Sequence, residues 1–313
     1  MSAPEFYRRP ARAIDRADAG HGPILLVDIL RGVNEFGTEL ASALARRVAV
    51  TVLTLVSAPL SDAAGVRLVR TFPEYWGSRN KFAKALQMLR AVLRLTVEVW
   101  RHRSTAVHIQ FFRLQFVDPV VYLLLRAFVR RLVYTAHNAL PHEPRWWHRS
   151  FYKAWYRLPD RIHVLSRYTR DRLVSELDVP ASKITVVPHG NYESVASRYA
   201  SSPSPQRESL GIPSNAFVIL FFGLIRPYKG VDRLIRAVGA VRSDVPVFLL
   251  IAGGGTATAL DEVRRGLAAY QLTECSLFDA RFIPEGELVA YLKMADLVAL
   301  PYSHIYQEAV SHA

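Results

Sequence analysis

Residues 221–237 read FFGLIRPYKGVDRLIRA and combine a strand, a turn and a helix in one short stretch. The apolar run 217–222 is typical of a buried strand, and Gly223 ends it. A turn that holds Arg226 and Lys229 follows, and a helical period of apolar residues begins directly after it. This order places backbone N–H groups and two positive charges beyond a strand end, where they can face a diphosphate. The stretch therefore predicts an α/β fold with a phosphate-binding turn.

Strand and helix patterns alternate along the chain in two blocks. In the first block we expect strands at 24–29, 48–56, 106–112, 132–136, 161–166 and 184–187, and helices at 38–47, 81–103 and 119–130. In the second block we expect strands at 217–222, 247–252, 275–278 and 297–300, and helices at 231–242, 257–270 and 286–294. Such alternation predicts doubly wound parallel sheets that helices cover on both faces.

A segment rich in Ser and Pro, 197–214, separates the two blocks and is the expected linker. We therefore predict one domain over 1–196 and another over 215–313. A doubly wound domain commonly has about six strands. Because the second block offers fewer, we expect the second domain to be incomplete and the chain to be cut within it.

Composition limits the class of protein. The chain has 313 residues, and half of them are hydrophobic, which is enough for two domains with cores of their own. The single cysteine, Cys275, excludes a disulfide framework and favours a reducing compartment. We find no apolar run of the length that a signal peptide or a membrane span needs. The sequence therefore predicts a cytoplasmic protein.

The net charge is +13, which suits nucleic acid, anionic lipid or phosphorylated ligands. The nucleic-acid alternative has no support beyond charge. The chain has no zinc-ligand spacing, no RNP-like aromatic strand and no single dense basic arm. We therefore predict no nucleic-acid partner.

The sequence of residues 221–237 closely resembles the donor-binding turn of retaining GT-B glycosyltransferases of family 4. The resemblance extends from about Ile24 to the end of the chain. It implies two Rossmann-like domains that face a cleft, with 1–196 on the acceptor side and 215–313 binding the nucleotide-sugar. It also implies transfer of a hexose, with retention, from a UDP-sugar or GDP-sugar to a glycan or lipid-linked acceptor in polysaccharide or glycolipid synthesis.

In this family an arginine and a lysine of the turn hold the donor diphosphate, and by the same resemblance Gly223 belongs to the predicted donor site. Lys229 fits that pattern directly, whereas the family's arginine follows the glycine, and here Leu224 occupies that place and Arg226 comes two residues later. Two cations already in position stabilise the charge of a leaving nucleoside diphosphate. Since no DxD carboxylate pair stands at a strand end, we predict no metal and no other cofactor.

Two glycine sites belong to the predicted donor site by resemblance. Gly253 and Gly254 follow the strand 247–252 as in the family's LLIAGGG segment, although a plain tight turn also fits. A dinucleotide site, and with it an NAD-dependent oxidoreductase, is improbable, because a lone glycine match is a weak signal and its place late in the chain is wrong for a dehydrogenase. Gly32, in the first strand-helix turn, is one glycine of the pair that the family carries there, and Gly37 is expected to serve helix packing.

Two catalytic residues are predicted by the same resemblance. His137 follows the strand 132–136, and family members place a histidine at this strand end in contact with the donor sugar; a loop-capping histidine is the alternative. Glu308 follows a strand that ends in Pro301, where the family has two glutamates about eight residues apart that hold the ribose and the sugar.

Segments 79–103 and 145–157 interleave cations with aromatic residues. On a helix the first segment gathers one apolar face of Phe82, Leu86, Leu89, Leu93, Val97 and Trp100, bordered by Lys81, Lys84, Arg90, Arg94, Arg101 and Arg103. Tryptophan and arginine at an apolar edge suit an anionic bilayer surface. We therefore predict a peripheral protein at the inner face of the membrane. Since the opposite face is also apolar, a helix packed in the core is the alternative.

The competing function for the whole chain is a non-catalytic protein that binds lipid or another polyanion on the same scaffold. Its basic charge fits both functions. Specific stabilisation by UDP or GDP on heating would favour the enzyme.

Overall fold

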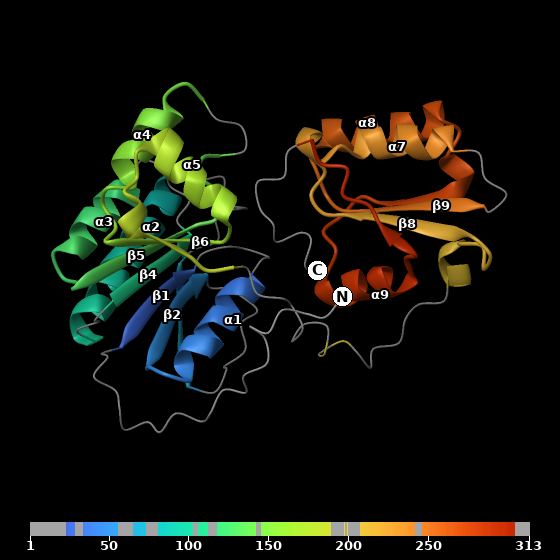
Figure 1. Ribbon diagram of the computed structural model, residues 1–313. Coiled ribbons are helices and arrows are strands. Elements are labelled where there is room, and N and C mark those ends of the chain that lie inside the picture. Colours follow the sequence, from blue (N-terminus) through green and yellow to red (C-terminus); the bar gives the residue numbers. More distant parts are fainter. Residues whose placement is uncertain are drawn as a thin grey trace, which may run out of the picture. The chain divides into compact units, whose positions relative to one another are not determined.

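The computed structural model describes residues 23–28, 34–55, 65–72, 81–102, 106–111, 118–141, 145–188, 197, 199, 207–241 and 246–303. The described residues up to Pro188 belong to one compact unit, and those from Ser197 to Ser303 belong to a second (Figure 1).

The first unit contains a seven-stranded, fully parallel sheet in the order β3-β2-β1-β4-β5-β6-β7. The strands are β1 (Ile24–Asp28), β2 (Val50–Leu55), β3 (Val66–Phe72), β4 (Ala106–Phe111), β5 (Arg131–Ala136), β6 (Arg161–Val164) and β7 (Ile184–Val186). A parallel sheet is buried on both faces, which explains why strands such as ILLVD in β1 are almost continuous apolar runs.

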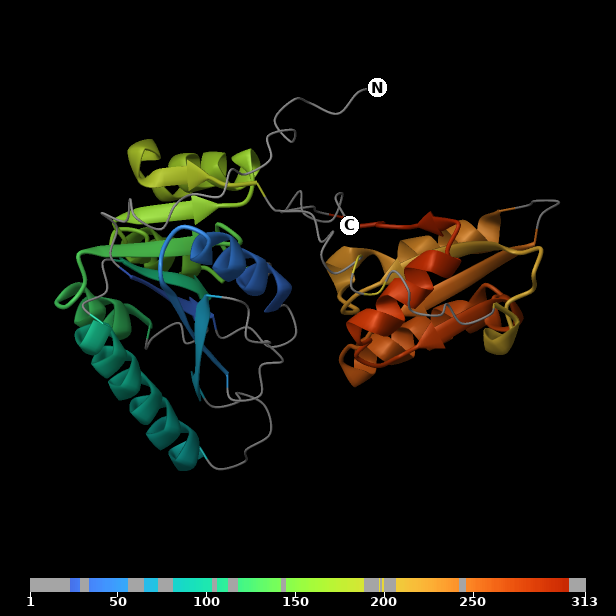
Figure 2. The ribbon, with the colours of Figure 1, turned by 90° about the horizontal axis from the view of Figure 1, so that it is seen from below.

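The helices of this unit are α1 (Asn34–Ala45), α2 (Lys81–His102), α3 (Asp118–Arg126), α4 (His148–Trp155) and α5 (Arg167–Leu177). The connection through α1 runs toward the β3 edge, and the connections through α2 to α5 run toward the β7 edge. Right-handed crossovers therefore place α1 on one face of the sheet and α2 to α5 on the other. Figures 1 and 2 show α1 and α2 on opposite sides of the strands.

The predicted elements of the first unit correspond to observed ones, with differences. The helix α1 begins at Asn34, earlier than expected, and α3 ends at Arg126, before the predicted end. The strand β3 and the helices α4 and α5 were absent from the predicted ranges. β3 lies at the sheet edge, and its exposed Arg67 and Arg70 interrupt the apolar residues, so that its sequence lacks the apolar run of the inner strands.

The second unit contains a four-stranded parallel sheet in the order β10-β9-β8-β11. Its elements are β8 (Phe217–Phe222), α7 (Val231–Ala240), β9 (Val247–Ala252), α8 (Ala257–Ala269), β10 (Ser276–Asp279), α9 (Glu285–Met294) and β11 (Leu297–Val298). One core cluster joins the sheet to α7 and α8, and another joins it to α9. Figure 1 shows these helices on the two sides of β8 and β9. The predicted α/β class and the parallel sheets are thereby confirmed.

The second half of the expected linker is folded on the second unit. Residues Arg207–Leu210 form a short 3₁₀ helix. The Arg207 guanidinium donates to the Met294 carbonyl oxygen at 2.6 Å and to the Asp296 carboxylate at 3.0 Å. The same carboxylate accepts from the Val218 backbone N–H at 2.7 Å. These bonds join the entry of the unit to the end of α9 and the start of β8.

Among the helices that the structure describes, none is both long enough and apolar enough to cross a bilayer.

Candidate functional site

The turn after β8 lies where the strand order of the second sheet reverses. From β8 the sheet grows through β9 and β10 on one side and through β11 on the other. Open parallel sheets bind their ligands beyond the carboxyl ends of the strands at such a switch point. Residues 223–230, which the sequence singles out, occupy this position.

Gly223 and Gly253 allow two strand ends to approach each other closely. Both have positive φ, 119° for Gly223 and 155° for Gly253. A Cβ on Gly253 would overlap with the carbonyl group of Gly223, so only glycine fits at this place. Gly254 differs, because a Cβ there would meet its nearest neighbour, the Arg281 carbonyl carbon, at an ordinary 3.6 Å. Its carbonyl oxygen instead accepts from the Ile225 N–H at 2.8 Å.

The ammonium group of Lys229 lies over Gly223. Its Nζ is 2.8 Å from the place that a Gly223 Cβ would occupy, and 5.1 Å from the centroid of the Tyr302 ring. Burial lowers the pKa of Lys229, and no charged neighbour contributes to this shift. Within the described residues, Lys229 therefore has an aromatic neighbour but no carboxylate partner. A partly desolvated cation in this state favours an anionic ligand.

The segment after β11 fixes the shape of the turn. The backbone N–H and the hydroxyl of Ser303 both donate to the Tyr228 carbonyl oxygen, at 2.8 and 3.0 Å. Gly230 has a φ of 68°, and a Cβ on it would overlap with the Pro301 carbonyl oxygen. The lysine between Tyr228 and Gly230 is therefore held from both sides.

The helix α7 begins directly after this turn, and Gly230 precedes it as a residue without a side chain to cap it. Within the first turn, the Arg233 N–H donates to the Gly230 carbonyl oxygen at 3.0 Å, whereas the N–H groups of Val231 and Asp232 and the positive end of the helix dipole can face an anion. Arg226 is exposed on the same turn. The second unit thus brings together four of the predicted donor-site residues: Gly223, Arg226, Lys229 and Gly253.

In the first unit, His137 lies just beyond β5 and is half-buried. The edge of its ring packs against Phe36 of α1, with centroids 5.5 Å apart and planes at 77°. The sequence placed His137 at a strand end but gave no sign of its partner.

A buried polar row leads across the sheet toward His137 on the same face. His108 of β4 lies 2.8 Å from the Thr135 hydroxyl of β5, and its ring centroid lies 5.0 Å from that of His163 on β6. Burial, and after it the neighbouring His163 and His137 as possible positive charges, lowers the pKa of His108 to about 3. Burial also lowers the pKa of His163. This row is therefore neutral at physiological pH.

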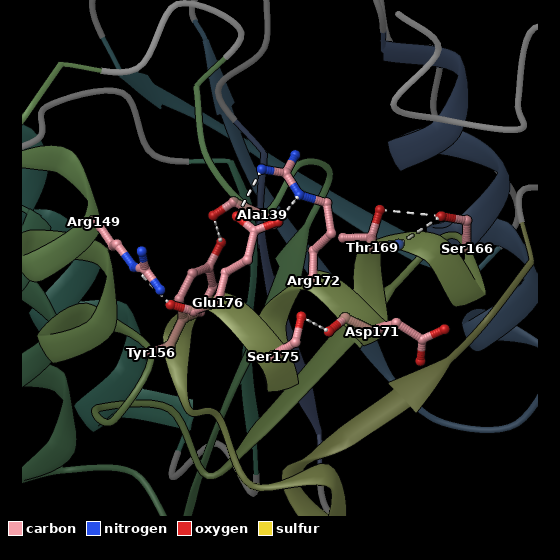
Figure 3. A network of polar contacts seen from close by, with 9 residues as sticks. All are labelled: Ala139, Arg149, Tyr156, Ser166, Thr169, Asp171, Arg172, Ser175 and Glu176. Atoms are coloured by element: carbon pink, nitrogen blue, oxygen red, sulfur yellow. Dashed lines mark hydrogen bonds and ion pairs between the residues drawn. The ribbon is translucent and has the colours of Figure 1, made fainter.

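The backbone that follows His137 is held by a side chain from α4's end. The Tyr156 hydroxyl is buried and donates to the carbonyl oxygens of Asn138 and Ala139, each at 3.1 Å. Figure 3 shows the bond to Ala139. Burial raises the pKa of this phenol, so that it remains a donor. Tyr156 therefore determines the direction in which the chain leaves β5.

Ser166, just beyond β6, has a structural role. Its hydroxyl accepts from the Thr169 N–H at 3.1 Å and so caps the N-terminus of α5 (Figure 3). The segment 145–157, which we predicted as part of a basic aromatic surface, contributes partly to the core. Trp155 and Tyr156 are buried there, whereas Trp146 is almost fully exposed.

The sequence missed three polar residues of the first unit. Asp28 is buried at the end of β1, where a Cβ on Gly37 would overlap with its carboxylate, so Gly37 indeed serves helix packing. The other two are His108 and His163, whose signal is their matched position on neighbouring strands. Gly32 and Glu308 lie outside the described residues. Within the described parts of the chain, no group of His, Cys, Asp or Glu side chains is arranged to hold a metal ion.

Comparisons with known families match both units. The model of Glycosyltransferase Family 4 matches residues 30–191, and that of Glycosyl transferases group 1 matches residues 204–312.

Individual relatives match shorter segments. A GDP-mannose-dependent alpha-(1-6)-phosphatidylinositol monomannoside mannosyltransferase from Mycolicibacterium smegmatis is 33% identical over 187 residues, which are 57% of this chain and 46% of that protein. A D-inositol 3-phosphate glycosyltransferase from Saccharomonospora viridis is 34% identical over 152 residues, which are 45% of this chain and 34% of that one. The chain therefore matches less than half the length of either relative.

Solved structures match over most of the chain. Sucrose-phosphate synthase from Thermosynechococcus elongatus has a TM-score of 0.70 at 17% identity, covering 93% of this chain and 78% of that one. HepE from Anabaena, in complex with UDP and glucose, has a TM-score of 0.66 at 18% identity, covering 91% and 76%. At these identities the likeness shows the fold.

Proposed function

The chain belongs to glycosyltransferase family 4 and has the GT-B fold, and from this premise we propose that the protein moves a hexose from a nucleotide diphosphate-sugar to a lipid-linked or glycan acceptor. We further propose that transfer proceeds with retention of the anomeric configuration and without a metal ion. The protein would then serve glycolipid or polysaccharide synthesis at the inner face of the membrane.

The observation that carries this proposal is the partly desolvated Lys229 ammonium over Gly223, with no carboxylate partner among the described residues. It lies beside the uncapped start of α7 at a sheet switch point. A diphosphate would satisfy the ammonium and the free N–H groups together.

The same groups can also assist the departure of the nucleoside diphosphate leaving group. As the glycosidic bond breaks, negative charge develops on the leaving phosphate oxygen. Lys229 is already fixed by the turn, and Arg226 stands exposed on it, so both can stabilise that charge with little rearrangement. Two cations would take the role that a metal ion has in other transferases.

His137 would contact the donor sugar as a neutral imidazole. A neutral imidazole can hydrogen-bond a sugar hydroxyl near the oxocarbenium-like transition state. Glu308 would add a carboxylate for the ribose or the sugar, and Gly32, Gly253 and Gly254 would line the donor site.

The donor and acceptor classes follow the relatives. The relative from Mycolicibacterium smegmatis is named for GDP-mannose and a phosphatidylinositol mannoside. The solved structure of HepE, a neighbour in fold, holds UDP and glucose. A UDP-hexose or GDP-hexose is therefore the proposed donor. The name of the first relative favours a lipid-linked acceptor over a free glycan.

Thermal unfolding with added nucleotides tests the proposal. UDP or GDP at about 100 times its dissociation constant should stabilise the protein by about 2.7 kcal/mol, whereas UMP and GMP should stabilise it far less. Lys229→Ala should remove most of this stabilisation, and Arg233→Ala, at an exposed position of α7, should not. If neither diphosphate raises the melting temperature, the donor site is wrong.

The non-catalytic alternative gives another result. A polyanion-binding protein would be stabilised by heparin or polyphosphate as well as by UDP or GDP, and Lys229→Ala would change little. Release of hexose-free nucleoside diphosphate from a UDP-hexose or GDP-hexose, when acceptor lipid is present, would exclude it.

A further inference from the structure

The helix α2 exposes the apolar face that its sequence predicts. Its 22 residues are about 33 Å long at 1.5 Å per residue. The exposed fractions are 40% for Leu86, 56% for Leu89, 57% for Leu93, 42% for Val97 and 69% for Trp100. Spacings of three and four place these side chains along one stripe. Figure 2 shows α2 along the rim of the first unit.

The opposite face of α2 already packs against the first unit. Ala91, Leu95 and Val99 are almost fully buried there. The core packing that we held as the alternative therefore belongs to the inner face, and it does not account for the outer stripe. A row of large apolar side chains that remains exposed on a long helix is typical of an interaction surface.

The charges beside the stripe have one sign. Arg90, Arg94 and Arg101 are all exposed on α2. The helix contains one acidic residue, Glu98, which is buried with its carboxylate 3.8 Å from the Arg67 guanidinium. The outer surface of α2 therefore offers cations and apolar groups but no exposed carboxylate.

We propose that the outer face of α2, defined by Leu86, Leu89, Leu93, Val97 and Trp100 with Arg90, Arg94 and Arg101, binds the surface of an anionic phospholipid bilayer. The apolar stripe enters the boundary between headgroups and acyl chains, with Trp100 at the headgroup level, and the arginines contact lipid phosphates. This partner deepens the proposed function, since a lipid-linked acceptor lies in the same surface.

A second copy of the chain is the other possible occupant of such a stripe. Its spacing resembles a coiled-coil seam, but pairing across a seam relies on opposite charges at the flanks. Among the residues of α2 whose side chains the structure describes, the exposed charges beside the stripe are those of arginines. Charge complementarity therefore favours the anionic bilayer.

Vesicle co-sedimentation tests this assignment with the wild-type protein and paired variants. Vesicles of phosphatidylcholine alone are compared with vesicles of equal parts phosphatidylcholine and phosphatidylglycerol. Arg90→Ser with Arg94→Ser removes two cations of α2, and its control is Arg46→Ser with Arg47→Ser, two exposed cations that follow α1 on the other face of the sheet. Leu89→Ser with Leu93→Ser removes the centre of the stripe, and its control is Val241→Ser with Phe282→Ser, two exposed apolar residues of the second unit.

We expect binding to the anionic vesicles that weakens with salt, because the Debye length shortens from about 10 Å at 0.1 M to about 3 Å at 1 M. Each α2 cation should contribute roughly fivefold to the partition coefficient, since a cation near the surface is worth about 1 kcal/mol. The leucine variant should lose at least about tenfold at either salt concentration. Both controls should bind like the wild type, and all variants should keep the wild-type melting temperature.

Equal binding to both kinds of vesicle, or equal losses in the variants and their controls, would overturn the proposal. A concentration-dependent dimer that Leu89→Ser with Leu93→Ser dissociates would assign the face to a second copy instead. Stabilisation by UDP or GDP does not involve α2, so that a failure here leaves the donor site untouched, and the reverse also holds.

Discussion

The carboxyl ends of β5 and β8 present a functional side chain in two different ways. Beyond β8, glycines let the backbone approach itself closely, and one short turn carries both cations. Beyond β5, the backbone is held by Tyr156 at the end of α4. His137 there borders the row of neutral polar side chains that β4, β5 and β6 contribute. The proposed phosphate-binding turn is thus a local property of the sequence, whereas the proposed sugar contact at His137 is assembled from residues far apart in the sequence.

The strongest test of this contrast is Lys229, the half-buried cation of the turn after β8. Lys229→Ala should lower turnover about a hundredfold or more, because a preorganised charge at the leaving diphosphate is lost. The melting temperature should hardly change, since the ammonium is partly desolvated without a carboxylate partner. The control is Arg233→Ala, whose turnover is measured in the same assay. If the two variants are equally active, the assignment of Lys229 is refuted.

Acid should affect the first unit through its neutral histidines. The folded state keeps the pKa of His108 at about 3 instead of 6.5, so below pH 6.5 the unfolded state takes up a proton that the folded state does not. The free energy of unfolding should therefore fall as pH decreases, by about 2 kcal/mol from this residue at pH 5. His163 contributes in the same direction.

Urea unfolding at pH 7 and pH 5 measures this effect. His108→Gln should be less stable at pH 7 but should lose much of the pH dependence. An unchanged slope in the variant would mean that the buried row is not what titrates.

The histidine beyond β5 should affect rate more than stability. His137→Ala should lower kcat/KM about tenfold, which corresponds to one lost hydrogen bond near the transition state. Its ring is half-buried and contacts Phe36, so only a small decrease in melting temperature is expected. A large loss of stability with full activity in the remaining folded protein would show that the histidine only caps the loop.

The smallest expected effect concerns the aromatic neighbour of Lys229. Tyr302→Leu removes a cation–π contact worth about 0.5–1 kcal/mol, whereas Tyr302→Phe keeps the ring. Losing the ring should lower the pKa of Lys229 further, so the alkaline limit of donor binding should move to lower pH in the Leu variant alone. Both variants keep Tyr228 and Arg226, which lie on the same turn, so these two residues do not contribute to the difference between the profiles. Coinciding pH profiles of both variants and the wild type would contradict this role.

The sequence predicted the second unit better than the first for a physical reason. Residues 223–230 are contiguous, and the strand, turn and helix around them leave a local pattern. The polar row is formed only because three strands are in register, which brings together His108, Thr135 and His163. Tyr156 likewise bonds to a residue that precedes it by 18 positions, Asn138, with α4 between them in the sequence. The strand β3 was missed because arginines interrupt its apolar positions at the sheet edge. For α2, the sequence showed two apolar faces but could not say which one was packed.

The bond between Arg207 and Asp296 has a consequence for how the second unit folds. Its ends are 89 residues apart, and the same carboxylate binds Val218 across 78 residues. Closing a loop of this length is entropically unfavourable until the intervening strands have paired. During synthesis the unit therefore cannot complete its sheet until β11 has left the ribosome, while β8 and β9 can pair long before. Its earliest folded form would be a β8–β9 pair with α7 and α8, and the phosphate turn would gain its rigidity last.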